Sequence, residues 1–299
     1  MYLAPAGGPY DGVARLVLNF SFGTFGCSGA LLNTGRHILT AGHCVTDFFG
    51  AELPNSASAT FITASGTTSV AAAAYHVFSG WDGQLFSGTD IAIIELAGLA
   101  PADANRYDIY TNTNEVGQVG NLVGFGIAGA GATGPLLGFG TRRHGQNIYD
   151  VAGDFFFGVS AAILLGDFDN GSVANDAIFF GGGPLQFGLG VNEVNIASGD
   201  SGGPTFLGGR IAGVHSFGAA WDDQAGNIAC PPDVITPANL HGPAGCKLDS
   251  SFGELFGDTR VSAFASFIND TIIPEPSTYF TVAIGLSGIL LWARRRKPA

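Results

Sequence analysis

The stretch "GCSGALLNTGRHILTAGHCV", residues 26–45, shows most directly how this chain folds. It holds an alternating apolar segment, a turn over residues 33–35, and a second apolar segment, "HILTA", that ends just before Gly42, His43 and Cys44. Short alternating segments separated by Gly and Asn are typical of antiparallel strands. The stretch therefore predicts two neighbouring strands, with a histidine directly after the second.

The composition extends this prediction to the whole chain. Its 299 residues suffice for one large domain or two small ones, and glycine alone accounts for 47 of them. Short apolar runs broken by Gly, Asn and Ser indicate an all-β protein with many turns. The formal net charge of −12 argues against a nucleic-acid-binding protein, because phosphate contacts need clusters of Lys and Arg.

Four cysteines fall into two pairs of similar spacing, Cys27 with Cys44 and Cys230 with Cys246. Neither pair has the C-x-x-C spacing of a zinc or redox site, so the sequence favours two local disulfides. Each would close a loop of roughly 17 residues and stabilise the fold by about 3 kcal/mol. Disulfides indicate an oxidising compartment, so we expect the protein to be exported.

The start of the chain shows no secretory signal. The segment "MYLAPAGGPYDG" lacks both a basic start and an apolar core. Two explanations are open: Met1 is not the true start, or a leader has been removed. We favour the first.

The chain ends in a mostly apolar run over residues 277–293, which follows Pro-Glu-Pro at residues 274–276 and precedes the basic run "RRRK". Seventeen residues is near the shortest length of a membrane-spanning helix, and the basic run would stay on the cytoplasmic side. The alternative is an amphipathic or buried helix, but no polar face recurs through residues 282–292. We therefore expect a membrane segment here.

This order of Pro-Glu-Pro, apolar helix and arginine cluster resembles the PEP-CTERM sorting signal of Gram-negative bacteria. The resemblance implies export, transient anchoring in the inner membrane, and removal of the signal near residues 274–276 by an exosortase. The mature protein would then be periplasmic, on the cell surface or extracellular.

A second informative stretch is "GDSGGP", residues 199–204, which leaves one hydroxyl, that of Ser201, among glycines. Such a serine is either a plain turn residue or a nucleophile beside backbone N–H donors. A nucleophilic serine needs a base that a carboxylate orients. Of the six histidines, His43 alone lies where a disulfide would hold its neighbour. Asp90, in "GTDIAIIEL", precedes an apolar core strand and would bury beside a histidine ring.

The blocks "CSGALL…ILTAGHC", "TDIAIIEL" and "SGDSGGP" resemble the three signature blocks of the trypsin/chymotrypsin family of serine proteases, in the family's order. Residues 121–129, "NLVGFGIAG", and 257–268, "GDTRVSAFASFI", also match. The resemblance implies an all-β fold of two packed six-stranded antiparallel barrels with a C-terminal α-helix, to which the hydrophobic sorting helix is added. We expect these parts to cover a protease domain (1–272), its first barrel (about 8–100), its second barrel (about 115–262), its C-terminal helix (about 260–270) and the sorting segment (273–299).

The same resemblance implies a serine endopeptidase that acts through an acyl-enzyme intermediate. Ser201 would be the nucleophile, His43 the general base and then acid, and Asp90 the orienting carboxylate. The N–H groups of Gly199 and Ser201 would form the oxyanion hole. No cofactor or metal is expected. The alternative is a catalytically inactive protein with this fold that serves as a surface or extracellular-matrix binding protein.

Two departures from the family pattern bear on this reading. In relatives, a freed N-terminal amine pairs with the aspartate that corresponds to Asp200, but here "GPYDGVARLVLN" already resembles the first barrel strand. Either the true start lies upstream, or Asp200 has another partner, or the loop is malformed. An insertion at about 219–255 contains Cys230 and Cys246, whose disulfide would staple it beside the substrate cleft.

The specificity pocket follows from the resemblance too. Asn195, six residues before the nucleophile, corresponds to the pocket floor, so a preference for Arg or Lys is not supported. His215 occupies the position of a histidine found in glutamate-specific relatives, which implies a preference for acidic or polar residues before the cut bond. The alternative is a histidine that is merely packed under its strand. The pocket wall and the substrate backbone site would be Ser216, Phe217 and Gly218.

One acidic segment, "GDFDNGSVAND" at residues 166–176, could suggest calcium. It lacks the spaced acids and terminal Glu of an EF-hand loop. We therefore expect a polar turn here rather than a calcium site.

Overall fold

The computed structural model describes residues 2–47, 49–220 and 248–272. The described residues up to 265 form one compact unit, and residues 266–272 belong to a second one. The predicted disulfide Cys230–Cys246 and the apolar run 277–293 lie outside the described residues.

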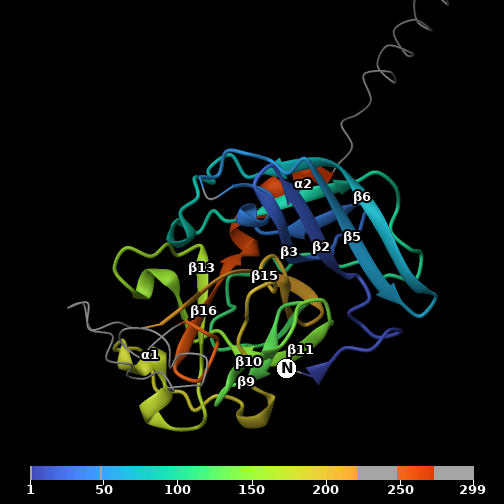
Figure 1. Ribbon diagram of the computed structural model, residues 1–299. Helices are drawn as coiled ribbons and strands as arrows, with labels where there is room; N and C mark the ends of the chain where they lie inside the picture. Colours follow the sequence, from blue (N-terminus) through green and yellow to red (C-terminus); the bar gives the residue numbers. More distant parts are fainter. Residues whose placement is uncertain (1, 48, 221–247, 273–299) are drawn as a thin grey trace, which may run out of the picture. The chain divides into compact units, whose positions relative to one another are not determined.

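The first half of the chain forms a closed antiparallel barrel with the strand order β2-β3-β4-β7-β6-β5 (Figure 1). Along β2 buried positions alternate with half-buried ones, because successive side chains of a strand point to opposite faces. Leu16, Leu18 and Phe61 are fully buried. The predicted first barrel is thus present. Its strands are β2 (Val13–Phe20), β3 (Gly23–Leu31), β4 (His37–Thr40), β5 (Ser56–Thr63), β6 (Gly66–Val77) and β7 (Ala92–Leu96).

Strands from residue 119 onward, joined at one edge by β1 from the start of the chain, form an eight-stranded sheet with the order β1-β11-β8-β14-β15-β16-β13-β12. The prediction of a closed six-stranded second barrel is therefore corrected to an open sheet within the described residues. Its strands are β1 (Tyr2–Leu3), β8 (Val119–Gly124), β11 (Arg143–Ile148), β12 (Val151–Ala152), β13 (Ile163–Phe168), β14 (Pro204–Leu207), β15 (Arg210–Ala219) and β16 (Glu254–Arg260).

The physical reason lies between β11 and β12, which only Tyr149 and Asp150 separate. β11 pairs with β8 near one end of the sheet, whereas β12 pairs with β13 at the other end. The chain bends here, so the sheet curls back on itself without a continuous ladder of hydrogen bonds. Tyr149 is buried and packs with Leu122, Leu164 and Phe256 inside the curl.

Smaller elements connect these strands. A separate hairpin pairs β9 (Ala128–Ala130) with β10 (Gly134–Leu137), and α1 (Ala177–Phe180) follows β13. The predicted C-terminal helix is present as α2 (Ala265–Ile272), but the turn before it, Val261–Phe264, is a 3₁₀ helix. In the described ranges, no helix has the length and apolar character that a membrane crossing requires.

Candidate active site

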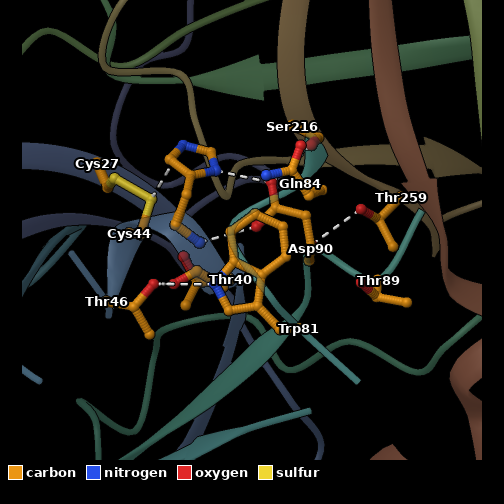
Figure 2. A network of polar contacts seen from close by, with 12 residues as sticks. Cys27, Thr40, Cys44, Thr46, Trp81, Gln84, Thr89, Asp90, Ser216 and Thr259 are labelled. Atoms are coloured by element: carbon orange, nitrogen blue, oxygen red, sulfur yellow. Dashed lines mark hydrogen bonds and ion pairs between the residues drawn. A yellow bond between two sulfur atoms is a disulfide. The ribbon is translucent and has the colours of Figure 1, made fainter. Parts of the chain in front are cut away.

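His43 lies on a 3₁₀ turn, Gly42–Cys44, directly after β4. A disulfide joins Cys44 to Cys27 of β3, with a Cα–Cα distance of 6.2 Å, as the sequence predicted. Thr46 Oγ1 donates to the Gly42 carbonyl at 3.0 Å and accepts a bond from Trp81 Nε1 at 2.9 Å. The turn that carries the histidine is therefore anchored on both sides (Figure 2).

Asp90 is fully buried just before β7, and its carboxylate faces this turn. The backbone N–H of His43 donates to Asp90 Oδ1 at 2.8 Å, and His43 Nδ1 lies 2.7 Å from Oδ2. Ser216 Oγ also donates to Oδ2, at 2.6 Å, and Thr259 Oγ1 donates to the Asp90 carbonyl at 2.8 Å (Figure 2). Because an ionised carboxylate only accepts, the proton of this contact belongs on His43 Nδ1. Nε2 then carries a lone pair and can act as a base, and its contact in the structure is Cys44 Sγ at 3.9 Å.

Two opposed effects set the pKa of His43. Burial lowers this pKa, while the charge of Asp90 and the hydrogen bond to it raise it, with a net rise above the ordinary value. The side chain remains 28% exposed. His43 therefore has one protected nitrogen and still reaches solvent.

Ser201 lies in the loop before β14, and this loop rests on the first barrel. The N–H of Ser28 donates to the Ser201 carbonyl at 2.8 Å, and Ser28 Oγ donates to the Gly199 carbonyl at 2.9 Å. At Gly202, where φ is +77°, a Cβ would come within 2.1 Å of Thr40 Oγ1. Only glycine permits this close approach of the loop to β4.

His43 and Ser201 line one cleft of about 860 Å³, together with Ser216. Within the described part of the chain, Ser201 Oγ forms no hydrogen bond, with His43 or any other residue. Catalytic hydrogen bonds are often long before substrate binds, so the shared cleft still suits a nucleophile and its base. The structure thus joins His43 directly to Asp90 and brings Ser201 to the same cleft.

The predicted oxyanion donors are on the same loop. Gly199 has a φ of +96°, which glycine adopts readily. No described residue accepts a hydrogen bond from the N–H of Gly199 or Ser201. Both donors therefore remain available to an oxygen bound in the cleft, as an oxyanion hole requires.

Asp200 finds partners within the fold. Its carboxylate is buried and accepts bonds from the N–H of Gly126, at 2.8 Å, and of Ala197, at 3.0 Å. A Cβ at Gly124 would meet Asp200 Oδ1 at 2.0 Å, so glycine is needed for this approach. Burial raises the pKa of Asp200, whereas the charge of His215 and the two N–H bonds oppose the rise. In this fold Asp200 thus has partners other than an N-terminal amine, namely the N–H groups of Gly126 and Ala197.

The predicted pocket residues divide into two groups. Ser216, Phe217 and Gly218 line the cleft. Asn195 instead lines a smaller cavity of about 30 Å³, and its Oδ1 accepts a bond from the N–H of Ile196. His215 is fully buried beneath the strand, with Nδ1 2.9 Å from Asp258 Oδ1.

The sequence did not single out the polar network behind His215. Asp258 Oδ2 also accepts bonds from Tyr149 at 2.5 Å and Thr205 at 2.6 Å. Asp258 belongs to the matched block at 257–268, but no local pattern links it to Tyr149, which is 109 positions away. The pairing of distant strands in the eight-stranded sheet, rather than any sequence motif, brings these side chains together.

Two groups of described side chains have metal-ligating atoms close together. The first is Cys27, His43 and Cys44, but its sulfurs are joined in the disulfide, so they are not thiolate ligands. The second is Asp167, Asp169 and Glu193, which meet near the end of β13.

Comparison with known proteins agrees with this arrangement. Residues 9–148 match the family model described as Trypsin. HL collagenase is similar in structure, at 18% identity and a TM-score of 0.58, over 92% of this chain and 98% of its own. Neuropsin, a serine protease expressed in the limbic system of mouse brain, is similar at 15% identity and a TM-score of 0.59, over 90% of this chain and 98% of its own. None of the curated protein sequences matches this chain.

The chain therefore resembles the trypsin-like serine proteases in sequence over its first half and in fold over most of its length. At sequence identities of 18% and 15%, the structural similarity establishes the fold alone. The activity has to be argued from the residues of the site.

Proposed function

We propose that this protein is a serine endopeptidase whose catalytic residues are His43, Asp90 and Ser201. The observation that carries the proposal is the buried Asp90 carboxylate, which accepts the Nδ1–H of His43 in the cleft that Ser201 lines. This pairing supplies an oriented base beside a hydroxyl, which is the constellation that acyl transfer by serine needs.

The mechanism follows from these atoms. Ser201 Oγ attacks the carbonyl carbon of the substrate while its proton passes to His43 Nε2, and Asp90 stabilises the imidazolium. The N–H groups of Gly199 and Ser201 stabilise the negative oxygen. His43 then gives the proton to the leaving amine as the peptide bond breaks. A water molecule, deprotonated by His43, hydrolyses the acyl-enzyme and restores Ser201.

Protein or peptide substrates fit this proposal, and a preference for acidic or polar residues before the cut bond is its finer part. The support for it is limited to His215, which lies beneath the cleft strand next to Ser216 and whose Nε2 has no hydrogen-bond partner among the described residues, while the Ser216 hydroxyl is already bound to Asp90. Digestion of a peptide library checks this. Cleavage mainly after Arg, or after Phe and Leu, would rule the preference out.

We also propose that the protein is exported and held for a time in the inner membrane by residues 277–293, until an exosortase-type enzyme removes them. The disulfide Cys27–Cys44 supports an oxidising compartment. Cell fractionation of the full chain, beside a variant in which residues 274–276 are replaced by alanine, tests this. Equal release of both proteins from the membrane would contradict it.

The activity itself is tested by covalent labelling with a fluorophosphonate, which reacts with an activated serine. We expect rapid labelling of the full chain and none of a Ser201→Ala variant. A folded wild-type protein that takes up no label would favour the alternative, a binding protein with an inactive site.

A further inference from the structure

A second polar centre lies in the other half of the molecule, where β13 ends. Asp167, Asp169 and Glu193 each place one carboxylate oxygen within 4.8 Å of the other two. Their exposed fractions are only 2%, 1% and 5%. Three acids thus converge on one point away from solvent, which is costly unless positive charge compensates them.

Backbone groups compensate them in part. Asp167 Oδ2 accepts a bond from the N–H of Ala177 at 2.7 Å, and Glu193 Oε1 accepts one from the N–H of Asp169 at 2.9 Å. The N–H of Gly171 donates to Asp169 Oδ1 at 2.5 Å. In the described ranges, no hydrogen bond or ion pair joins these carboxylates to a Lys or Arg.

One buried carboxylate oxygen of this group has no hydrogen-bond partner among the described residues. Asp169 Oδ2 is buried and accepts no hydrogen bond from the described residues, although its carboxylate belongs to the convergent group. A buried carboxylate oxygen left in this way loses its hydration without compensation. It therefore points to a ligand that the described residues do not supply.

We propose that Asp167, Asp169 and Glu193 bind a calcium ion. The donors are all oxygens, which excludes the softer metals that select sulfur or imidazole ligands. Carboxylates separated by less than 4.8 Å can share one Ca²⁺ at 2.3–2.6 Å each, and Ca²⁺ accepts the irregular geometry that separate loops produce. Water and backbone carbonyls would complete its shell of six to eight oxygens.

The surrounding charges favour the same ion. Two further carboxyl groups, those of Asp150 and Asp176, act on Asp167 through their negative charge. A divalent cation would relieve this repulsion.

The site would stabilise the segment that leads to the nucleophile. Glu193 lies two residues before Asn195, and Asn147 Nδ2 donates both to the Asp167 carbonyl, at 2.6 Å, and to the Val194 carbonyl, at 2.8 Å. Calcium would therefore tie the connection between β13 and β14 to the sheet at both ends. This role does not depend on the proposed peptidase activity.

The expectation of a polar turn at residues 166–176 missed this arrangement for a simple reason. Asp167 belongs to the end of β13 and only Asp169 to the turn after it, and the third acid is 24 positions beyond Asp169. Only the fold brings it to the same point.

Titration calorimetry and thermal unfolding of the full chain, freed of metal with EGTA, test the proposal with CaCl₂ as the probe. We expect stoichiometric binding and a rise in Tm of roughly 5–10 °C at calcium 100-fold above Kd. Asp169→Asn and Glu193→Gln should each abolish most of this rise. Asp103→Asn, at an exposed aspartate in the connection between β7 and β8, is the matched control and should keep it.

In EGTA, Asp169→Asn should be at least as stable as the wild type, because it removes one of the crowded charges. This variant is therefore expected to fold, and it separates ligation from a merely structural role. No calorimetric binding of Ca²⁺ at millimolar concentration, or an unchanged Tm rise in Asp169→Asn, would overturn the proposal. Binding of Mg²⁺ as tight as that of Ca²⁺ would overturn the choice of ion.

Discussion

The closed barrel and the open sheet hold their functional groups in different ways. In the barrel, His43 follows β4 and Asp90 precedes β7, and these two strands pair directly with each other. In the sheet, Ser201 and Glu193 lie on the long connection between β13 and β14. Strand ladders and a disulfide position the first pair, whereas the second depends on contacts to other parts of the chain.

This difference indicates where the site is robust and where it is sensitive. The geometry of His43 and Asp90 is set within one barrel. The Ser201 loop rests on Ser28 of the barrel from one side and on Gly126 of the sheet from the other. The reacting groups are therefore brought together by packing between the halves, and changes on each side should have different effects.

The largest effect should come from the sheet side. Ser201→Ala removes the nucleophile and should lower kcat about 10⁶-fold, as in serine proteases generally. Hydrolysis of a reactive ester or peptide substrate measures the loss, and an unchanged Tm shows that the fold is intact. Residual activity above a hundredth of the wild type would assign the nucleophile elsewhere.

Asp90→Asn tests the barrel side and should lower kcat about 10⁴-fold, the loss known for this substitution in serine proteases. Because Asp90 raises the pKa of His43, the wild-type activity should fall as the pH drops through this raised pKa. In the variant, burial alone acts on His43, so the acid limb should move to lower pH. The pH profile of kcat/KM measures both. An unmoved limb would separate His43 from catalysis, and Asp82→Asn serves as an exposed control.

Gly126→Ala tests how the sheet holds the Ser201 loop. A Cβ there would lie 2.6 Å from Asp200 Cγ and 2.8 Å from the Asp200 nitrogen, so Asp200 must move. We expect kcat/KM to fall about 10²–10³-fold, as when an oxyanion donor is lost. Gly98→Ala, which meets nothing within 4 Å, should behave as the wild type. Full activity in Gly126→Ala would show that the Asp200 contact does not position the loop.

The smallest effect should come from the barrel disulfide. Replacing Cys27 and Cys44 together by serine should lower the free energy of unfolding by about 3 kcal/mol, since the bond closes a 17-residue loop. Denaturant unfolding under oxidising conditions measures the change. The wild type in reducing agent should shift to match the variant, and no shift in either would mean that the strand ladder alone holds the turn.

The sequence predicted the closed barrel better than it predicted the open sheet. The alternating segment and turn within residues 26–45 and the apolar run after Asp90 predicted three of the barrel strands, because these patterns depend on neighbouring residues alone. The closure of the second barrel was predicted from resemblance and was corrected. The bend at Tyr149 and Asp150 depends on how distant strands pair, and no local pattern reports this.

The candidate residues divide likewise. Ser216, Phe217 and Gly218 were expected in the pocket and do line the cleft. Asn195 and His215 were expected there as well, yet Asn195 faces a smaller cavity and His215 is buried against Asp258. The resemblance placed His215, Ser216, Phe217 and Gly218 on one strand, which is β15, but the direction of each side chain depends on its neighbours in the fold.

Local features of the chain were sufficient to predict strands, turns, one disulfide and the residue types suited to acyl transfer, because backbone geometry and side-chain period act over a few positions. The tertiary structure alone brought the Asp90 carboxylate into contact with His43 and placed Asp200 close to Gly124 and Gly126. It also gathered Asp167, Asp169 and Glu193 near the end of β13. Those contacts join residues tens of positions apart, and burial gives them their energy. A local sequence pattern does not show which distant polar groups will be buried together away from water.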